Sequence, residues 1–367
     1  MSPLLDSKNL IEQIRHNCSI SDCRYAGTYS VCGLALRLRD LYKWEKGLEP
    51  WVEKDSSVVL EWIGEKEEEW DKLEGQEFKG ITVAGETFDP FDVEGLNAVV
   101  TPLGLFYGAG YVQGLKPSFL LAELAETRQV EGSPVYVLGR EHARDLLTVP
   151  ALSQGNSILI RKESAKLFLW NLIFFLKKSS KEALRFALET YGVPDHHPKA
   201  LKENFARICE DEVETYIYHE LGELRDTDFD REAWRDIVAA FPHSLIEFFV
   251  RAVKDILADT NEHGKLRYII REKKAASFAL YAAFLDGLRS MLFPELAEAF
   301  KIFQSTHHWE PVEEARWSGY RAARAHAEAI TEIYRSGRED IGRVAKEIEK
   351  TVLGPLGILK WKREEGE

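Results

Sequence analysis

The sequence predicts an α+β protein, with a mixed N-terminal part that contains a small antiparallel sheet and a mainly α-helical bundle after it. Two patterns indicate this class. Between residues 77 and 161, Gly and Pro recur among short β-branched and aromatic runs, as in strands joined by turns. After Lys162, nearly every stretch has apolar residues at helical spacing, and the connections are short and polar. The change of pattern predicts two domains, residues 1–161 and 162–367.

The N-terminal part is expected to begin with helices and to continue as strands. Helical spacing predicts helices over Leu4–His16, Gly33–Trp44 and Ser56–Leu73. The cysteine-bearing stretch between the first two is expected to be a loop. Strand patterns cover Lys79–Val83, Ala98–Thr101, Leu105–Val112, Ser118–Leu121, Val135–Leu138 and Ser157–Ile160. A short helix over Glu141–Leu147 is expected to interrupt the sheet.

The C-terminal part reads as helices throughout. They are expected over Ser164–Leu176, Lys181–Tyr191, Pro198–Arg225, Asp230–Ala240, Pro242–Ala258, Leu266–Leu288, Pro294–Phe303, Pro311–Tyr334 and Glu339–Val352. Short connections between successive helices are typical of an antiparallel bundle.

Composition narrows the class of function. The formal charge of −13 and the pI near 5.4 argue against sequence-independent nucleic-acid binding, which depends on basic side chains. The longest apolar run, Leu167–Leu176, is broken by Asn171 and is far shorter than the roughly 20 residues that span a membrane. The N-terminus has mixed charges and no secretory pattern, and four cysteines are too few for a disulfide scaffold. We therefore expect a cytoplasmic protein with reduced thiols that binds neither membranes nor nucleic acid.

The strongest chemical pattern lies on the helix expected over Pro198–Arg225. On a helical projection, Glu212, His219 and Glu223 fall within roughly 40° of one another, at the edge of the apolar face. A carboxylate is costly to bury unless it is paired, protonated or bound to a cation. His326, on the apolar and small-residue face of the helix over Pro311–Tyr334, could complete the group. The four side chains predict a metal site.

A site of carboxylates and histidine favours iron or manganese over a softer metal. The spacing is not the Glu-x-x-His of helical di-iron proteins, and the stretch His219–Glu223 (HELGE) lacks the second histidine of the HExxH metalloproteases. The competing interpretation is an ordinary boundary pair, in which each side chain hydrogen-bonds a neighbour.

The cysteines offer a weaker alternative. Cys18, Cys23 and Cys32 lie close in sequence, and His16 could supply a fourth ligand, but none of the usual zinc or iron–sulfur spacings is met. Buried thiols without metal are the competing interpretation.

Two hypotheses about function follow. The first is a metal-binding helical-bundle enzyme with a Glu/His site. The second is a non-catalytic scaffold, in which the inward polar residues form a satisfied network and a helical face binds a protein partner or a second copy of the chain. An enzyme needs a concave site with converging polar groups, whereas a scaffold needs an exposed apolar patch.

Overall fold

The computed structural model describes residues 7–112, 115–175, 181–194, 197–227, 230–285 and 287–359. The chain divides into an N-terminal unit, Met1–Asn171, and a C-terminal unit, Leu172–Glu367. The α+β class is confirmed, because the first unit contains a five-stranded sheet and the second is helical. Within the described ranges, no helix is both long and apolar enough to cross a membrane.

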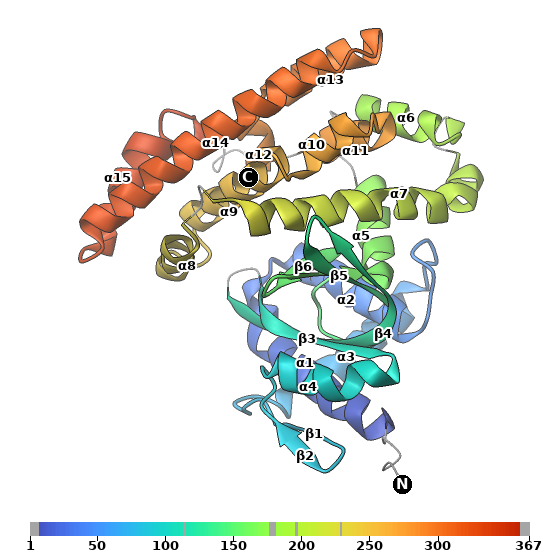
Figure 1. The fold of residues 1–367 in the computed structure, drawn as a ribbon. Coiled ribbons are helices and arrows are strands. Elements are labelled where there is room, and N and C mark those ends of the chain that lie inside the picture. Colours follow the sequence, from blue (N-terminus) through green and yellow to red (C-terminus); the bar gives the residue numbers. More distant parts are fainter. Residues whose placement is uncertain are drawn as a thin grey trace. The chain divides into compact units, whose positions relative to one another are not determined.

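The N-terminal unit combines helices with two sheets (Figure 1). Its helices are α1 (Ser7–Tyr25), α2 (Val31–Glu45), α3 (Ser56–Asp71), α4 (Val93–Val100) and most of α5 (Lys162–Phe174), with 3-10 turns at Ala26–Thr28 and Thr101–Leu103. A hairpin joins β1 (Ile81–Val83) to β2 (Glu86–Phe88). The larger sheet has the order β3-β4-β5-β7-β6, formed by β3 (Leu105–Val112), β4 (Lys116–Val130), β5 (Ser133–Arg144), β6 (Ala151–Gln154) and β7 (Ser157–Arg161).

The larger sheet is curled, as the ring of strands in Figure 1 shows, and each of its faces has its own core. On one face, Tyr107 and Phe119 pack with Leu10 and Ile14 of α1 and with α4. On the other face, the core consists of side chains from the strands themselves. Alternating residues reach opposite faces of a strand, so the neighbours Phe106 and Tyr107 belong to different cores.

Three local predictions for this unit are wrong. The sheet is mixed, because β5 and β7 pair in parallel while the other pairs are antiparallel. Residues 98–100 end α4 instead of forming a strand, since the Asp92 side chain caps the helix by accepting from Gly95 N at 2.9 Å. Most of the helix expected over Glu141–Leu147 is the end of β5, where burial of charged side chains disguises the strand alternation.

The expected cysteine loop is also helical. Leu4 lies outside the described residues, but α1 runs on to Tyr25 and carries both Cys18 and Cys23. The buried face of α1 includes polar side chains, among them Asn17 and Ser21, which conceal its helical period. Their hydrogen bonds to the Lys79 and Pro117 carbonyls explain why they are buried.

The C-terminal unit is built from helices, with α7, α9 and α14 prominent among them (Figure 1). Its elements are α6 (Lys181–Thr190), α7 (Pro198–Arg225), α8 (Arg231–Ala240), α9 (Leu245–Thr260), α10 (Lys265–Arg271), α11 (Ala275–Phe284), α12 (Gly287–Leu292), α13 (Glu295–Thr306), α14 (Glu310–Gly337), α15 (Ile341–Ile348) and a π-turn at Glu349–Leu353. Most expected helices are confirmed, although Leu176 lies outside the described residues. The segment expected as one helix over Leu266–Leu288 is instead broken where Lys273 and Gly287 adopt positive φ.

Helix α9 packs against α7, α14 and α10. Its contact with α7 brings backbone against backbone. A Cβ atom added at Gly222 of α7 would lie 2.0 Å from the Ala258 carbonyl oxygen, and one at Gly264 would lie 2.2 Å from the same atom. Asn261 Nδ2 also donates to the Gly222 carbonyl at 2.9 Å. Helices α7 and α9 therefore lie very close together at Gly222, which is next to the place where their charged side chains meet.

Candidate metal centre

The charged side chains of α7 and α9 meet beside this glycine contact. His219 and Glu223 are one helical turn apart on α7, and Asp255 and Asp259 are one turn apart on α9. Such spacing places each pair on one face of its helix, and the close packing of α7 on α9 turns the two faces toward each other. Four ionisable groups are thus brought together from two helices.

His219 is at the centre of the group. Its Nδ1 lies 2.7 Å from Asp259 Oδ1, and its Nε2 lies 3.5 Å from Glu223 Oε1. One ligand atom each from His219, Glu223 and Asp255 lie within 4.8 Å of one another. The His219 and Glu223 side chains are 25% and 15% exposed, whereas Asp259 is 4% exposed. Asp259 therefore anchors the imidazole from the buried side, and the converging atoms can be reached from solvent.

The ionisable side chains of the group shift one another's pKa values. Burial alone would lower the pKa of His219, but Asp259 and Glu223 outweigh it and raise that pKa well above its ordinary value. Burial opposes ionisation of Glu223 as well, yet Lys254, whose Nζ lies 2.6 Å from Oε2, and His219 lower its pKa to about 2. Burial raises the pKa of Asp255. These shifts favour the protonated form of His219, whose charge, together with that of Lys254, offsets the carboxylates around it.

Glu220 is a further carboxyl beside this group. It is buried on α7, and no other described residue forms a hydrogen bond or ion pair with it. Burial and the Glu223 charge raise its pKa to about 7. The folded protein therefore binds this proton more tightly than the unfolded chain does, so Glu220 reduces stability as the pH rises from about 4.5 through 7.

We expect Glu220→Gln to stabilise the protein at pH 8, on the order of 2 kcal/mol, and to leave stability nearly unchanged at pH 4.5. The amide keeps the shape of the side chain and cannot ionise. Urea unfolding at both pH values measures the difference. Glu210→Gln, an exposed position on the same helix, should show no such pH dependence. Equal effects of Glu220→Gln at the two pH values would contradict the account of its burial.

Of the four residues that the sequence predicts as metal ligands, the structure brings His219 and Glu223 together. Glu212 lies two turns before His219 on α7, roughly 10 Å along the axis, where Thr215 Oγ1 contacts its Oε2 at 3.0 Å. His326 of α14 is half-buried with its ring edge against Phe249, 5.7 Å between centroids, and burial lowers its pKa. Neither belongs to the cluster of ligand atoms found in the described part of the chain.

Sequence reasoning missed the contribution of α9. Asp255 and Asp259 are at i, i+4 spacing, and Lys254 precedes them, so the segment has the pattern of the charged face of an amphipathic helix. The structure shows that Asp259 is buried between Ala258 and Thr260 at the end of the helix, which its sequence position does not reveal. A carboxylate in such surroundings needs a partner.

The cysteines do not form a cluster of metal-ligating groups among the described residues. Cys18 Sγ donates to the Phe119 carbonyl at 3.3 Å, and Cys23 Sγ donates to the Trp70 carbonyl at 3.2 Å. Burial raises the pKa of both thiols, which disfavours the thiolate that binds metal. Cys32 is exposed on α2.

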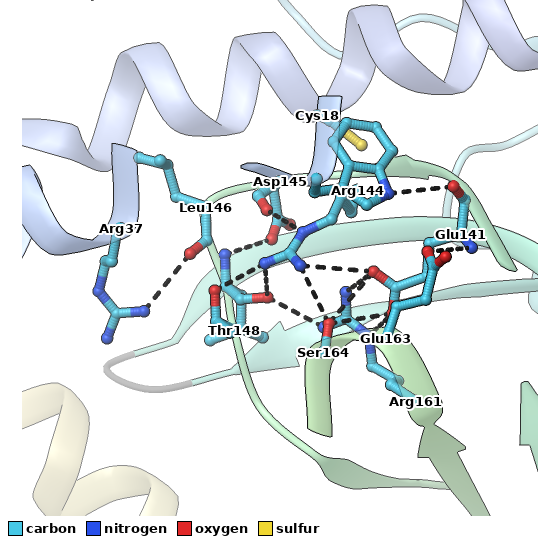
Figure 2. A network of polar contacts seen from close by, with 12 residues as sticks. Cys18, Arg37, Glu141, Arg144, Asp145, Leu146, Thr148, Arg161, Glu163 and Ser164 are labelled. Atoms are coloured by element: carbon cyan, nitrogen blue, oxygen red, sulfur yellow. Dashed lines mark hydrogen bonds and ion pairs between the residues drawn. The ribbon is translucent and has the colours of Figure 1, made fainter. Parts of the chain in front are cut away.

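The N-terminal unit holds a second charged network, drawn in Figure 2. The Arg161 guanidinium, 1% exposed, donates to both oxygens of Glu141, at 2.8 and 3.0 Å. Ser164 Oγ also lies within hydrogen-bonding distance of both oxygens. Arg144 contacts Ser164 and donates to the Leu147 carbonyl at 3.0 Å. The charged groups of this network thus have hydrogen-bonding partners, as the burial of charge requires.

A pair of buried carboxyl groups lies next to this network. Asp145 accepts from the Phe119 and Leu147 amides, and Asp22 accepts from the Leu146 amide at 2.9 Å. Burial, followed by the charge of Asp145, raises the pKa of Asp22 well above its ordinary value. The bond between Asp22 and Leu146 attaches α1 to the loop that follows β5.

Two family models match the chain. The N-terminal domain of a family of unknown function (DUF6866) matches residues 9–161, and the C-terminal domain of the same family matches residues 166–353. No curated protein and no solved structure matches the chain.

Proposed function

The chain belongs to the DUF6866 family of unknown function, and we propose from its C-terminal unit that it binds a divalent metal ion through His219, Glu223 and Asp255. The observation that carries the proposal is the His219–Asp259 contact. A metal-ligating histidine commonly donates its second ring N–H to a carboxylate, which fixes the tautomer and turns the other nitrogen toward the metal. Asp259 holds Nδ1 at 2.7 Å and leaves Nε2 facing Glu223.

The type of ligand favours manganese or ferrous iron. One imidazole nitrogen and two carboxylates form a mixed nitrogen and oxygen set without thiolates, which suits these ions better than copper(I). Three protein ligands also leave coordination positions for water or a substrate. An ion with such open positions can polarise a bound water or carbonyl, which is the chemistry that a metal-dependent enzyme would use.

Charge balance supports the proposal. With the ion bound, Nε2 of His219 must be unprotonated, so the ion would replace the proton that otherwise holds the carboxylates together. Lys254 contacts Glu223 through Oε2, whereas the atom nearest to Nε2 is Oε1. The lysine can therefore keep its partner while Oε1 turns to the ion.

The test is elemental analysis of protein purified without chelators or metal-affinity columns, followed by titration with Mn²⁺ or Fe²⁺ under anaerobic conditions. We expect one ion per chain, proton release on binding, and tighter binding as the pH rises. His219→Gln and Glu223→Gln should abolish binding. Asp259→Asn should weaken it about 10- to 100-fold, because it disturbs only the residue that orients His219.

His326→Gln is the matched control, because it removes a histidine of the same unit outside the cluster. It should bind metal like the parent protein. Loss of the ion in His326→Gln but not in His219→Gln would show that the site lies on α14 and not beside His219. A metal-free parent that takes up no ion on reconstitution would reject the proposal and favour the scaffold hypothesis, with the α7–α9 charges as a buried network that fixes helix register.

A further inference from the structure

A cavity of about 560 Å³ lies between α8 and the second half of α14 in the C-terminal unit. This volume is within the range of pockets that hold small organic ligands. Trp234 and Ala327, each 4% exposed, line its buried part. Glu328, Glu332 and Arg335 also line it and are exposed, so the cavity is open to solvent on their side.

The charged residues of this α8–α14 cavity favour a cationic ligand over an anionic one. Three carboxylates line it, from Asp230, Glu328 and Glu332, against one guanidinium, from Arg335, which makes a net charge of −2. The guanidinium is already bound by Asp230 Oδ2, so it is occupied toward an anion. Glu328 Oε1 accepts from Arg324 Nε at 2.9 Å. Glu332 forms no hydrogen bond or ion pair with another described residue, so its carboxylate is open to a new partner.

The buried part of the cavity favours an organic cation over a metal ion. An exposed carboxylate alone holds a cation weakly, because water solvates both charges. The remaining binding energy must come from apolar contact, and a ligand whose alkyl chain lies against Trp234 and Ala327 removes apolar surface from water. Among the aromatic side chains, an indole also attracts organic cations most strongly. A hydrated inorganic ion would gain nothing from this surface.

We infer that the α8–α14 cavity binds an alkylguanidinium or alkylammonium group, with the charge at Glu332 and the alkyl chain against Trp234 and Ala327. This is the chemistry of an arginine or lysine side chain and of a free aliphatic amine. The cavity does not include His219 or the residues grouped with it, so the inference does not depend on the proposed metal site.

The first test compares n-butylguanidinium with n-butylurea, a neutral molecule of nearly the same shape. Each is titrated into the full chain at low ionic strength with EDTA present, and binding is followed by the NMR signals of the ligand. We expect butylguanidinium to bind with a Kd of about 1 mM or below, to bind roughly tenfold more tightly than butylurea, and to weaken as salt is added. Equal binding of the two molecules, or no binding of butylguanidinium, would overturn the inference.

Variants locate the binding. Glu332→Gln removes the charge at an exposed position, so it should weaken butylguanidinium binding about fivefold and leave butylurea unaffected. Glu314→Gln, exposed on the same helix but outside the cavity, should bind like the parent. Thr331→Phe fills part of the cavity without a change of charge and should weaken both molecules. Unchanged binding in both Glu332→Gln and Thr331→Phe would place the ligand elsewhere and overturn the inference.

Two further probes separate the sources of the cation. A blocked Gly-Arg-Gly peptide represents an arginine on a partner protein, and agmatine represents a free amine. Tighter binding of the peptide than of butylguanidinium would support a protein partner, and tighter binding of agmatine would support a free amine. If neither probe competes with butylguanidinium, the cavity does not recognise the cationic group of either source, and the inference is overturned.

Discussion

Replacing Arg161 with methionine is expected to lower the free energy of unfolding of the N-terminal unit by about 3–5 kcal/mol. The substitution removes both hydrogen bonds to Glu141 and leaves that carboxylate buried without its closest counter-charge. The loss should be large because solvent cannot reach the site: Arg161 is 1% exposed. Chemical denaturation followed by tryptophan fluorescence measures it.

The control for Arg161→Met is a surface ion pair. Lys8 and Glu12 are 87% and 64% exposed with 3.9 Å between Nζ and Oε1, so Lys8→Met should change stability by less than about 0.5 kcal/mol. The double variant Arg161→Met, Glu141→Leu should recover part of the loss, because it removes the orphaned charge. A small effect of Arg161→Met would mean that Arg144 alone can balance Glu141.

The second large effect is expected for Gly222→Ala. The new Cβ would lie 2.0 Å from the Ala258 carbonyl oxygen, and backbone atoms cannot move aside as a flexible side chain can. Helices α7 and α9 must separate, at a cost of about 3 kcal/mol or more. Because Glu223 follows Gly222, the same variant should weaken metal binding. Urea unfolding and a metal titration measure the two effects.

Gly342→Ala is the matched control within the C-terminal unit. Its Cβ would meet only Asp340 Oδ1, at an ordinary 3.6 Å, so the change in stability should stay within about 0.5 kcal/mol. Equal stability of the Gly222→Ala and Gly342→Ala variants would show that α7 and α9 can separate without loss.

Elements with regular apolar spacing could be predicted from the sequence. Pro198–Arg225 was predicted with the bounds of α7, because Pro198 marks the first turn and the apolar period continues to Leu224. Leu105–Val112 was predicted as the strand β3. The failures occur where polar side chains are buried: Asn17 and Ser21 hid the length of α1, and Glu141 and Arg144 gave the end of β5 a helical pattern.

The candidate site could be predicted only in the part that one helix carries. His219 and Glu223 share a face of α7 by their spacing, which a projection reveals. Asp255 and Asp259 join them because α9 packs against that face, and the sequence of one helix does not specify which helix will be its neighbour. Glu212 was grouped with His219 because a projection along the axis removes the distance between successive turns.

The curl of the N-terminal sheet has a consequence for how other chains could associate with it. The edge strands are β3 and β6, and the curl brings them together: the Gln154 side chain of β6 accepts a hydrogen bond from the Ala109 amide of β3 at 3.2 Å. An unpaired strand edge is a template for edge-to-edge aggregation and for strand addition by a peptide. Here one amide of that edge is already occupied by the protein's own glutamine, and β6 is only four residues long. A peptide that added a strand to β3 would therefore have to displace the Gln154 contact.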